Sequence, residues 1–182
     1  MKNTYKLFAL ILIICVIPTM VSAGLGARFG FSKDASNETY DEGMTLIGAD
    51  YRFTAIPMVD IIGTLEYSWK KYSAGGAIPA EGTRHFFTAN ISVVKPFDIS
   101  LLKPYAGIGY GFHLLGGSLS IMGNPVGGAA LTGTGFHMIG GLRISPPAAP
   151  IAVYGEWRHY WTNFSLGNSR YITLSAGVMI GF

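Results

Sequence analysis

Residues 171–182 alternate between two kinds of side chain. Every second residue from Ile172 to Phe182 is apolar, whereas the interleaved residues from Tyr171 to Gly181 are mostly small or polar. A period of two indicates a β-strand with one face in an apolar environment and the other in a crowded, more polar one. The stretch is long for a strand of a soluble protein and has about the length of a tilted strand that crosses a bilayer.

The same alternation recurs in seven earlier stretches, so the pattern predicts eight strands in all. The links after the second, fourth and sixth strands are short, and the other links are longer. This alternation is typical of a membrane barrel, in which short turns lie at the periplasmic rim and longer loops lie at the external rim. The sequence therefore predicts an all-β fold, an eight-stranded antiparallel up-and-down transmembrane β-barrel, closed by pairing of the last strand with the first. The expected strands cover about residues 25–31, 44–53, 59–69, 84–94, 103–115, 131–144, 151–161 and 171–182.

The first 23 residues have the pattern of a secretory signal peptide. A basic start is followed by an apolar run over residues 7–17 and by small residues up to Ala23, so we expect cleavage before Gly24 and a barrel domain over residues 24–182. A membrane anchor or a lipidated Cys15 are the alternatives. Cleavage removes Cys15 and two lysines, which leaves 11 basic and 10 acidic residues. This balance gives no support to a nucleic-acid partner.

The charged residues separate a membrane barrel from a soluble one. A soluble eight-stranded barrel such as a lipocalin also alternates, but its interior is apolar and surrounds a ligand. Here the face opposite the apolar one carries charges that cannot line an apolar cavity, and this favours the membrane barrel. The residues assigned to this interior face are Arg28, Asp50, Arg52, Asp60, Glu66, Arg84, Arg143, Glu156 and Arg158.

Several stretches resemble the small OmpA/OmpX-type outer-membrane barrels of Gram-negative bacteria. Residues 104–112 are similar to the fifth strand of that family and residues 154–160 to its seventh, and the chain ends on Gly181-Phe182. The resemblance covers the whole mature chain and implies a location in the cell outer membrane, in contact with lipid and lipopolysaccharide. It also implies that the barrel assembly machinery recognises the last strand through Phe182. We expect a monomer.

The interior of an eight-stranded barrel is just wide enough for side chains to fill. Because buried charges need partners, the nine inward residues predict a salt-bridged plug in place of a conducting path. We expect Arg28, Glu66, Glu156 and Arg158 to form a cluster at mid-depth, and Asp50, Arg52, Asp60 and Arg143 to lie nearer the periplasmic rim. Glycines of the fifth, sixth and eighth strands leave either a space filled by long residues of the first four strands, which we favour, or an open slot.

Residues 156–165 are the one stretch that could carry catalysis. Lipid A deacylases are outer-membrane barrels that need a serine nucleophile and a histidine base within hydrogen-bond reach. His159 faces lipid by parity, but Trp161 occupies the position where a His-x-Ser spacing needs serine, and Ser165 is six residues away. We therefore expect no enzyme, no metal site and no cofactor. The tryptophans belong with an interfacial aromatic belt made of Trp69, Trp157, Trp161 and Phe182.

Three functions remain open from the sequence. The favoured hypothesis is an outer-membrane barrel with a plugged interior and a structural or surface-interaction role through its external loops. The alternatives are a narrow porin-like channel or carrier for small apolar compounds and, less favoured, a lipid A-modifying enzyme at His159.

Overall fold

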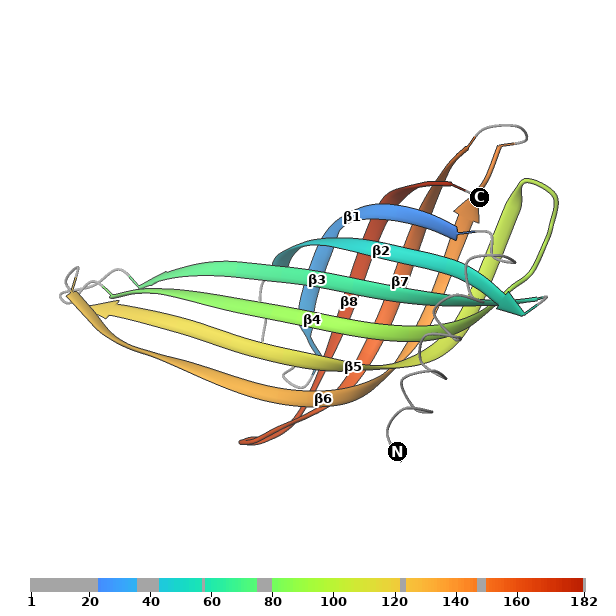
Figure 1. The fold of residues 1–182 in the computed structure, drawn as a ribbon. Helices are drawn as coiled ribbons and strands as arrows, with labels where there is room; N and C mark the ends of the chain where they lie inside the picture. The colour runs from blue at the N-terminus through green and yellow to red at the C-terminus, as the bar shows by residue number, and fades with distance from the viewer. Residues whose placement is uncertain are drawn as a thin grey trace, which may run out of the picture.

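Eight antiparallel strands form a closed barrel in chain order (Figure 1). The computed structural model describes residues 23–35, 43–56, 58–74, 80–121, 124–146 and 150–181, so the predicted signal peptide up to residue 22 lies outside the described residues. The barrel closes where Leu25 to Asp34 pair with Tyr171 to Ile180. The predicted fold class is confirmed. The strands are β1 (Ala23–Asp34), β2 (Met44–Ile56), β3 (Val59–Ala74), β4 (Ala80–Pro96), β5 (Leu102–Ile121), β6 (Asn124–Ile144), β7 (Ile151–Phe164) and β8 (Gly167–Ile180).

The outside of the barrel is apolar and exposed. Leu65, Ile91, Ile108 and Leu174 each expose more than half of their surface, with values of 54%, 64%, 55% and 62%. The strand alternation turns these residues outward and turns the charged residues inward, as on β7, where buried and exposed residues alternate along its length. An apolar surface of this extent around a whole barrel is stable in lipid and not in water.

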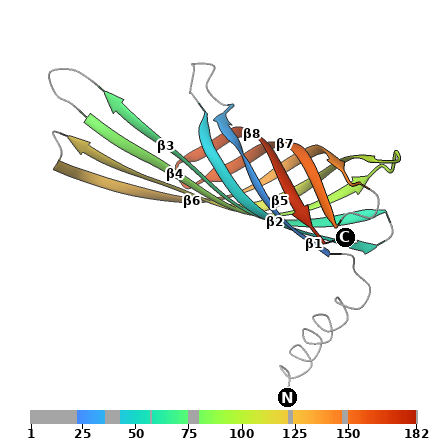
Figure 2. The same ribbon diagram turned by 90° about the horizontal axis from the view of Figure 1, so that it is seen from above.

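Four neighbouring strands, β3 to β6, continue beyond the barrel wall (Figures 1 and 2). β2 accompanies β3 only as far as Trp69, and β7 accompanies β6 only from Gly133 onward. Among the residues that the structure describes, the ladder beyond these points joins only β3, β4, β5 and β6. We call this projection the external sheet. It consists of residues 70–74, 80–84, 116–121 and 124–132.

The external sheet corrects the sequence prediction. Long loops were expected over residues 70–83 and 116–130, and both predictions are wrong for most of their length, because the described residues there are strands. The sheet stands outside the apolar belt, so it does not need alternating apolar residues, and its backbone ladder forms without them. A prediction from apolar periodicity therefore places the end of each strand where the apolar outer surface of the barrel ends.

The opposite end of the barrel carries the short turns, and we call it the turn end. The β4–β5 connection is held by a bridge between Ile99 and Leu102, with Ser100 at a positive φ of 56°. The amide of Phe97 also donates a hydrogen bond to the carbonyl of Pro104 at 2.8 Å. In the predicted topology this end faces the periplasm and the external sheet faces the cell exterior.

Buried apolar residues lie in two groups inside the barrel. One, toward the external sheet, contains Met44, Phe86, Tyr160, Phe164 and Tyr171; the other, toward the turn end, contains Ile62, Val94, Tyr105 and Ile139. The buried charged residues lie between these two groups and toward the turn end. Among the described residues, no helix is long and apolar enough to span a membrane.

Candidate functional site

Five charged side chains, which we call the central cluster, meet in the middle of the barrel: Arg28, Asp50, Glu66, Glu156 and Arg158. Nη1 of Arg28 lies 3.2 Å from Oδ1 of Asp50 and 3.1 Å from Oε1 of Glu66. Oε1 of Glu156 accepts hydrogen bonds from Nη2 of Arg28 at 2.5 Å and from Nε of Arg158 at 2.6 Å. All five are buried, and the most exposed, Arg28, shows 4% of its surface. Each guanidinium is therefore compensated by more than one carboxylate.

Each carboxylate of the central cluster also accepts a hydrogen bond from a buried tyrosine. The tyrosines come from β5 and β7, so they tie the cluster to the far wall of the barrel. Thr64 adds a further link, since its hydroxyl donates to Oδ1 of Asp50 at 2.8 Å. Charge-assisted hydrogen bonds of this kind are the strong ones in a protein interior. The pairs are Tyr154 with Asp50, Tyr160 with Glu66 at 3.1 Å, and Tyr105 with Glu156 at 2.7 Å.

Large side chains occupy the space that the interior glycines leave. A Cβ atom on Gly109 would lie 2.4 Å from the ring of His137, and one on Gly177 would lie 2.4 Å from the ring of Tyr154. The space is thus filled, as we favoured from the sequence. Part of the filling comes from the expected strands, because Val94 and Asn90 of β4 lie against Gly107 and Gly111, and part comes from β6 and β7, which carry His137 and Tyr154.

An aromatic layer closes the barrel between the central cluster and the external sheet. The rings of Tyr160 and Tyr171 stack with their centroids 4.2 Å apart, and Phe86 meets Tyr171 edge-on at 4.8 Å. His113 is fully buried beside them, with Nδ1 at 2.9 Å from the hydroxyl of Tyr171. The hollow above this layer has a volume of only about 60 Å³. The central cluster and this aromatic layer are thus two successive layers of buried side chains inside the barrel.

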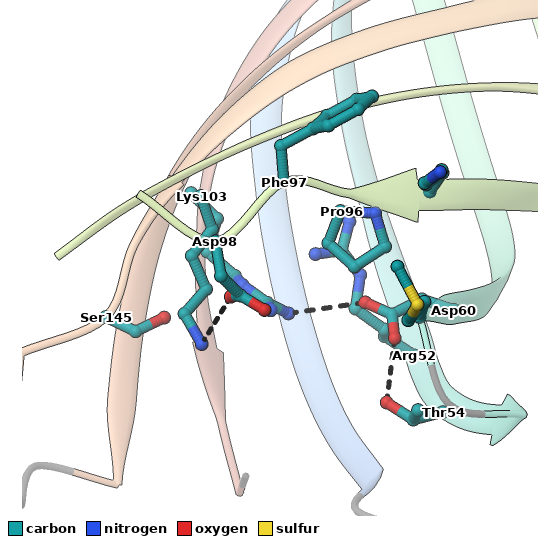
Figure 3. A pocket seen from close by; sticks show the side chains of 11 residues that line it. Arg52, Thr54, Asp60, Pro96, Phe97, Asp98, Lys103 and Ser145 are labelled. Carbon is teal, nitrogen blue, oxygen red and sulfur yellow. Dashed lines mark hydrogen bonds and ion pairs between the residues drawn. The ribbon is translucent and has the colours of Figure 1, made fainter. Parts of the chain in front are cut away.

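The turn end, in contrast, opens into a pocket of about 630 Å³ (Figure 3). Oδ1 of Asp60 accepts a hydrogen bond from Thr54 at 2.7 Å, and its Oδ2 lies 3.7 Å from Nη1 of Arg143. At the mouth, Nζ of Lys103 lies 3.1 Å from Oδ1 of Asp98. We call this cavity the turn-end pocket. Its charged lining consists of Arg52, Asp60, Lys95, Asp98, Lys103 and Arg143.

Asp50 differs from its expected depth. The sequence placed it near the periplasmic rim, but the structure brings it into the central cluster. Gly26 is the direct partner of Asp50 across the β1–β2 ladder, and Arg28 is a diagonal neighbour. The long arginine side chain spans that diagonal, so depth judged along a single strand is misleading. Arg52, Asp60 and Arg143 do lie at the turn end, around the turn-end pocket.

Arg84 lies nearer the external sheet than the other interior charges, and the predicted aromatic belt stays a prediction. Arg84 is half-buried and lies opposite Lys70 on the β3–β4 ladder of the external sheet, so it lies away from the central cluster. Trp69 and Trp161 lie toward the same end of the barrel. Trp157 faces outward next to Glu156, at the depth of the central cluster. Phe182 lies outside the described residues.

His159 packs among aromatic rings on the lipid-facing side of β7. Its ring stacks on Trp161 at 4.2 Å and meets Trp157 edge-on at 6.1 Å. Nε2 of His159 has no hydrogen-bond partner among the described residues. Over the part of the chain that the structure describes, no group of histidine, cysteine or acidic residues could hold a metal ion.

The sequence reasoning did not identify the tyrosines of the central cluster as functional. Tyr154 and Tyr160 share the inward parity of Glu156, which is the signal that could have found them. For Tyr105, the signal is weaker, because it stands only three residues into β5. Its contact with Glu156 depends on the closure of the barrel.

Comparisons with known proteins agree on the fold. No protein-family model and no curated protein matches the sequence. Among solved structures, the chain is similar to Neisserial surface protein A, with 16% identity, a TM-score of 0.59, and coverage of 89% of this chain and 97% of that one. It is also similar to the attachment invasion locus protein Ail of Yersinia pestis, solved with the heparin analogue sucrose octasulfate, with 14% identity, a TM-score of 0.55, and 88% and 97% coverage.

A third similar structure is a major outer membrane protein of Thermus thermophilus, with 10% identity, a TM-score of 0.54, and coverage of 89% of this chain and 99% of that one. At these identities the likeness shows the fold and not the activity. The chain has the fold of the small outer-membrane β-barrels, as its sequence predicted. The predicted location in an outer membrane agrees with this fold and with the apolar outer surface.

Proposed function

We propose that the protein is an outer-membrane barrel with a closed interior that acts as a surface-interaction protein through the external sheet. The observation that carries this proposal is the free edge of β6. Within the described part of the chain, residues 124–132 of β6 pair only with β5, because pairing with β7 begins at Gly133. The edge of a sheet presents unpaired N–H and C=O groups that can bind another extended chain.

The two edges of the external sheet differ in how they are protected. The β3 edge carries Lys70 and Lys71, and lysines are a common guard against strand addition. Residues 126–132 of the β6 edge contain no charge and consist of small and apolar side chains, with Val126 59% exposed. A long uncharged edge on a surface that faces the cell exterior fits an extended polypeptide segment of a partner.

The fold neighbours support a surface role in general terms, since two of them are named as a surface protein and as an attachment protein. A channel or carrier is less well supported, because the central cluster and the aromatic layer both fill the barrel. A lipid A-modifying enzyme is also less well supported, because His159 packs against tryptophans.

The β5–β6 hairpin can be shortened without changing its register. Gly116 pairs with Ala130, so replacement of residues 117–129 by Asn-Gly joins the two strands through a two-residue turn. The matched control shortens the β3–β4 hairpin at the Lys71–Thr83 pair in the same way. Both variants keep every barrel strand.

Proteoliposomes with each form are passed over immobilised β-casein, an unstructured polypeptide, and over immobilised heparin. We expect the full chain to bind β-casein, the β5–β6 variant to lose that binding, and the β3–β4 variant to retain it. Equal binding by all three forms, or no binding by the full chain, contradicts the proposal. Binding to heparin alone also contradicts it, because a polyanion does not add a strand.

A further inference from the structure

We propose that the turn-end pocket binds a phosphate group. Its lining contains four cationic side chains, from Arg52, Lys95, Lys103 and Arg143, and two carboxylates, from Asp60 and Asp98, so its formal charge is +2. The pocket has a volume of about 630 Å³, which is larger than a bare ion needs. The site thus has the sign and the size for an anionic group attached to a larger molecule.

Arg52 is the residue that most clearly lacks a counter-charge. It is 3% exposed and lines the pocket, with its guanidinium carbon 4.4 Å from the centre of the Tyr105 ring. Among the residues that the structure describes, its Nε has no hydrogen-bond partner and it makes no ion pair. A buried guanidinium without an anion is costly, and a cation–π contact compensates it only in part.

Both carboxylates of the pocket lining are already engaged. Asp60 uses Oδ1 to accept from Thr54 and places Oδ2 near Arg143 (Figure 3). Asp98 is paired with Lys103 at the mouth. An incoming anion therefore meets an Arg52 whose contact is the Tyr105 ring and not a carboxylate, with Lys103 and Lys95 also in the pocket lining.

Phosphate is the anion that these donors fit best. Guanidinium groups bind phosphate through planar pairs of N–H groups, and lysines add mobile positive charge. Phe97 and Lys95 also form part of the wall, where Nζ of Lys95 lies 5.8 Å from the centre of the Phe97 ring and Phe97 is 48% exposed. This apolar rim allows two sources: a phospholipid whose chain lies along Phe97, or a soluble phosphate compound that enters from the periplasmic side.

Binding is measured on the full chain folded in octyl glucoside, a detergent without phosphate, by native mass spectrometry and isothermal titration calorimetry. The probes are phosphatidylglycerol, diacylglycerol with the same acyl chains, and inorganic phosphate. The variants are Arg52→Gln and Lys103→Gln. The matched control is Lys71→Gln, which removes the same charge from an exposed position on the external sheet. Heat-modified mobility on gels verifies that each form has folded.

We expect saturable binding of one phosphate-bearing probe per barrel, weakened about tenfold or more by Arg52→Gln and less by Lys103→Gln, and unchanged by Lys71→Gln. Binding of phosphatidylglycerol but not of inorganic phosphate supports the proposal with a lipid source, and binding of both supports it with a soluble source. Equal binding of phosphatidylglycerol and diacylglycerol overturns it. So does equal loss in all three variants.

A rival explanation is that Arg52 balances the excess carboxylate of the central cluster through Tyr105. It predicts that Arg52→Gln destabilises the barrel and that Lys103→Gln leaves phosphate binding unchanged, and this result also overturns the proposal. Lys103 is partly exposed, so its variant folds even where the Arg52 variant does not. The test does not depend on the proposed surface function, because shortening the β5–β6 hairpin leaves every residue of the pocket in place.

Discussion

The central cluster and the turn-end pocket use the same kinds of side chain with opposite results. In the central cluster, Arg28 and Arg158 each contact three carboxylates, and three tyrosines satisfy those carboxylates from the other side. In the turn-end pocket, Arg52 has an aromatic ring and no carboxylate. A compensated group of charges stabilises a closed interior, whereas an uncompensated one is available to a ligand.

The difference arises from the position of each group along the barrel. The central cluster is enclosed by eight strands, so each charge must find its partner within the protein. The turn-end pocket lies at a rim, where solvent or a ligand can supply what the protein does not. This comparison gives four predictions, from the largest expected effect to the smallest.

The largest effect is expected for Glu156→Gln. Glu156 accepts from both arginines of the central cluster and from Tyr105, so its neutralisation leaves buried guanidiniums short of counter-charge. We expect the free energy of unfolding to fall by about 3–5 kcal/mol. The measurement is urea unfolding of the barrel in lipid vesicles, followed by tryptophan fluorescence. Glu81→Gln, at an exposed position of the external sheet, is the control, and an equal effect of both substitutions contradicts the account.

The second effect is expected for Tyr154→Phe. This substitution removes only the hydroxyl that donates to Asp50, while Arg28 and Thr64 still contact that carboxylate. We expect a loss of about 1.5–3 kcal/mol in the same unfolding measurement. Tyr110→Phe, on the exposed outer face, is the matched control and should change the stability by less than about 0.5 kcal/mol.

The third effect is expected for Gly109→Ala. The added methyl group would lie 2.4 Å from the ring of His137 and 2.5 Å from the carbonyl of Ile91, so the filled interior must shift to accept it. We expect a loss of about 1–3 kcal/mol. Gly155→Ala, where no atom lies within 4 Å of the new methyl group, should be nearly neutral. If the two alanines behave alike, the space beside Gly109 is not filled.

The smallest effect is expected for Arg52→Gln. Because Arg52 has no carboxylate partner, its removal leaves no carboxylate unpaired and relieves a buried charge. We expect the stability to stay within about 1 kcal/mol of the original chain or to rise. Arg158→Gln, measured alongside, should lose several times more. A large loss for Arg52→Gln removes the distinction between the two groups of charges.

Side-chain parity predicted the most from the sequence. A period of two along each strand assigned Arg28, Glu66, Glu156 and Arg158 to the interior, and the structure buries all of them. Parity depends only on the pleat of the strand, so it survives an error in the strand ends. The link lengths supported the number of strands, because with a wrong number the long links would not all fall at one rim.

Depth and strand length could not be read in this way. Asp50 joins the central cluster through a diagonal contact across β1 and β2, and the stagger that creates this contact is a property of the closed barrel. The external sheet extends beyond the closed barrel, where neither face has to be apolar, so residues 116–132 carry no periodic signal. The depth of Asp50 and the length of these strands both depend on pairing between strands, and the pattern along a single strand carries no information about that pairing.

The central claim is that the central cluster and the aromatic layer close the barrel. Single-channel recording of the full chain in planar lipid bilayers tests this claim most directly, with a porin of known conductance as the control for insertion. We predict no conductance steps at any applied voltage while the protein is shown by its gel mobility to be folded. Regular steps whose size scales with salt concentration would contradict the account.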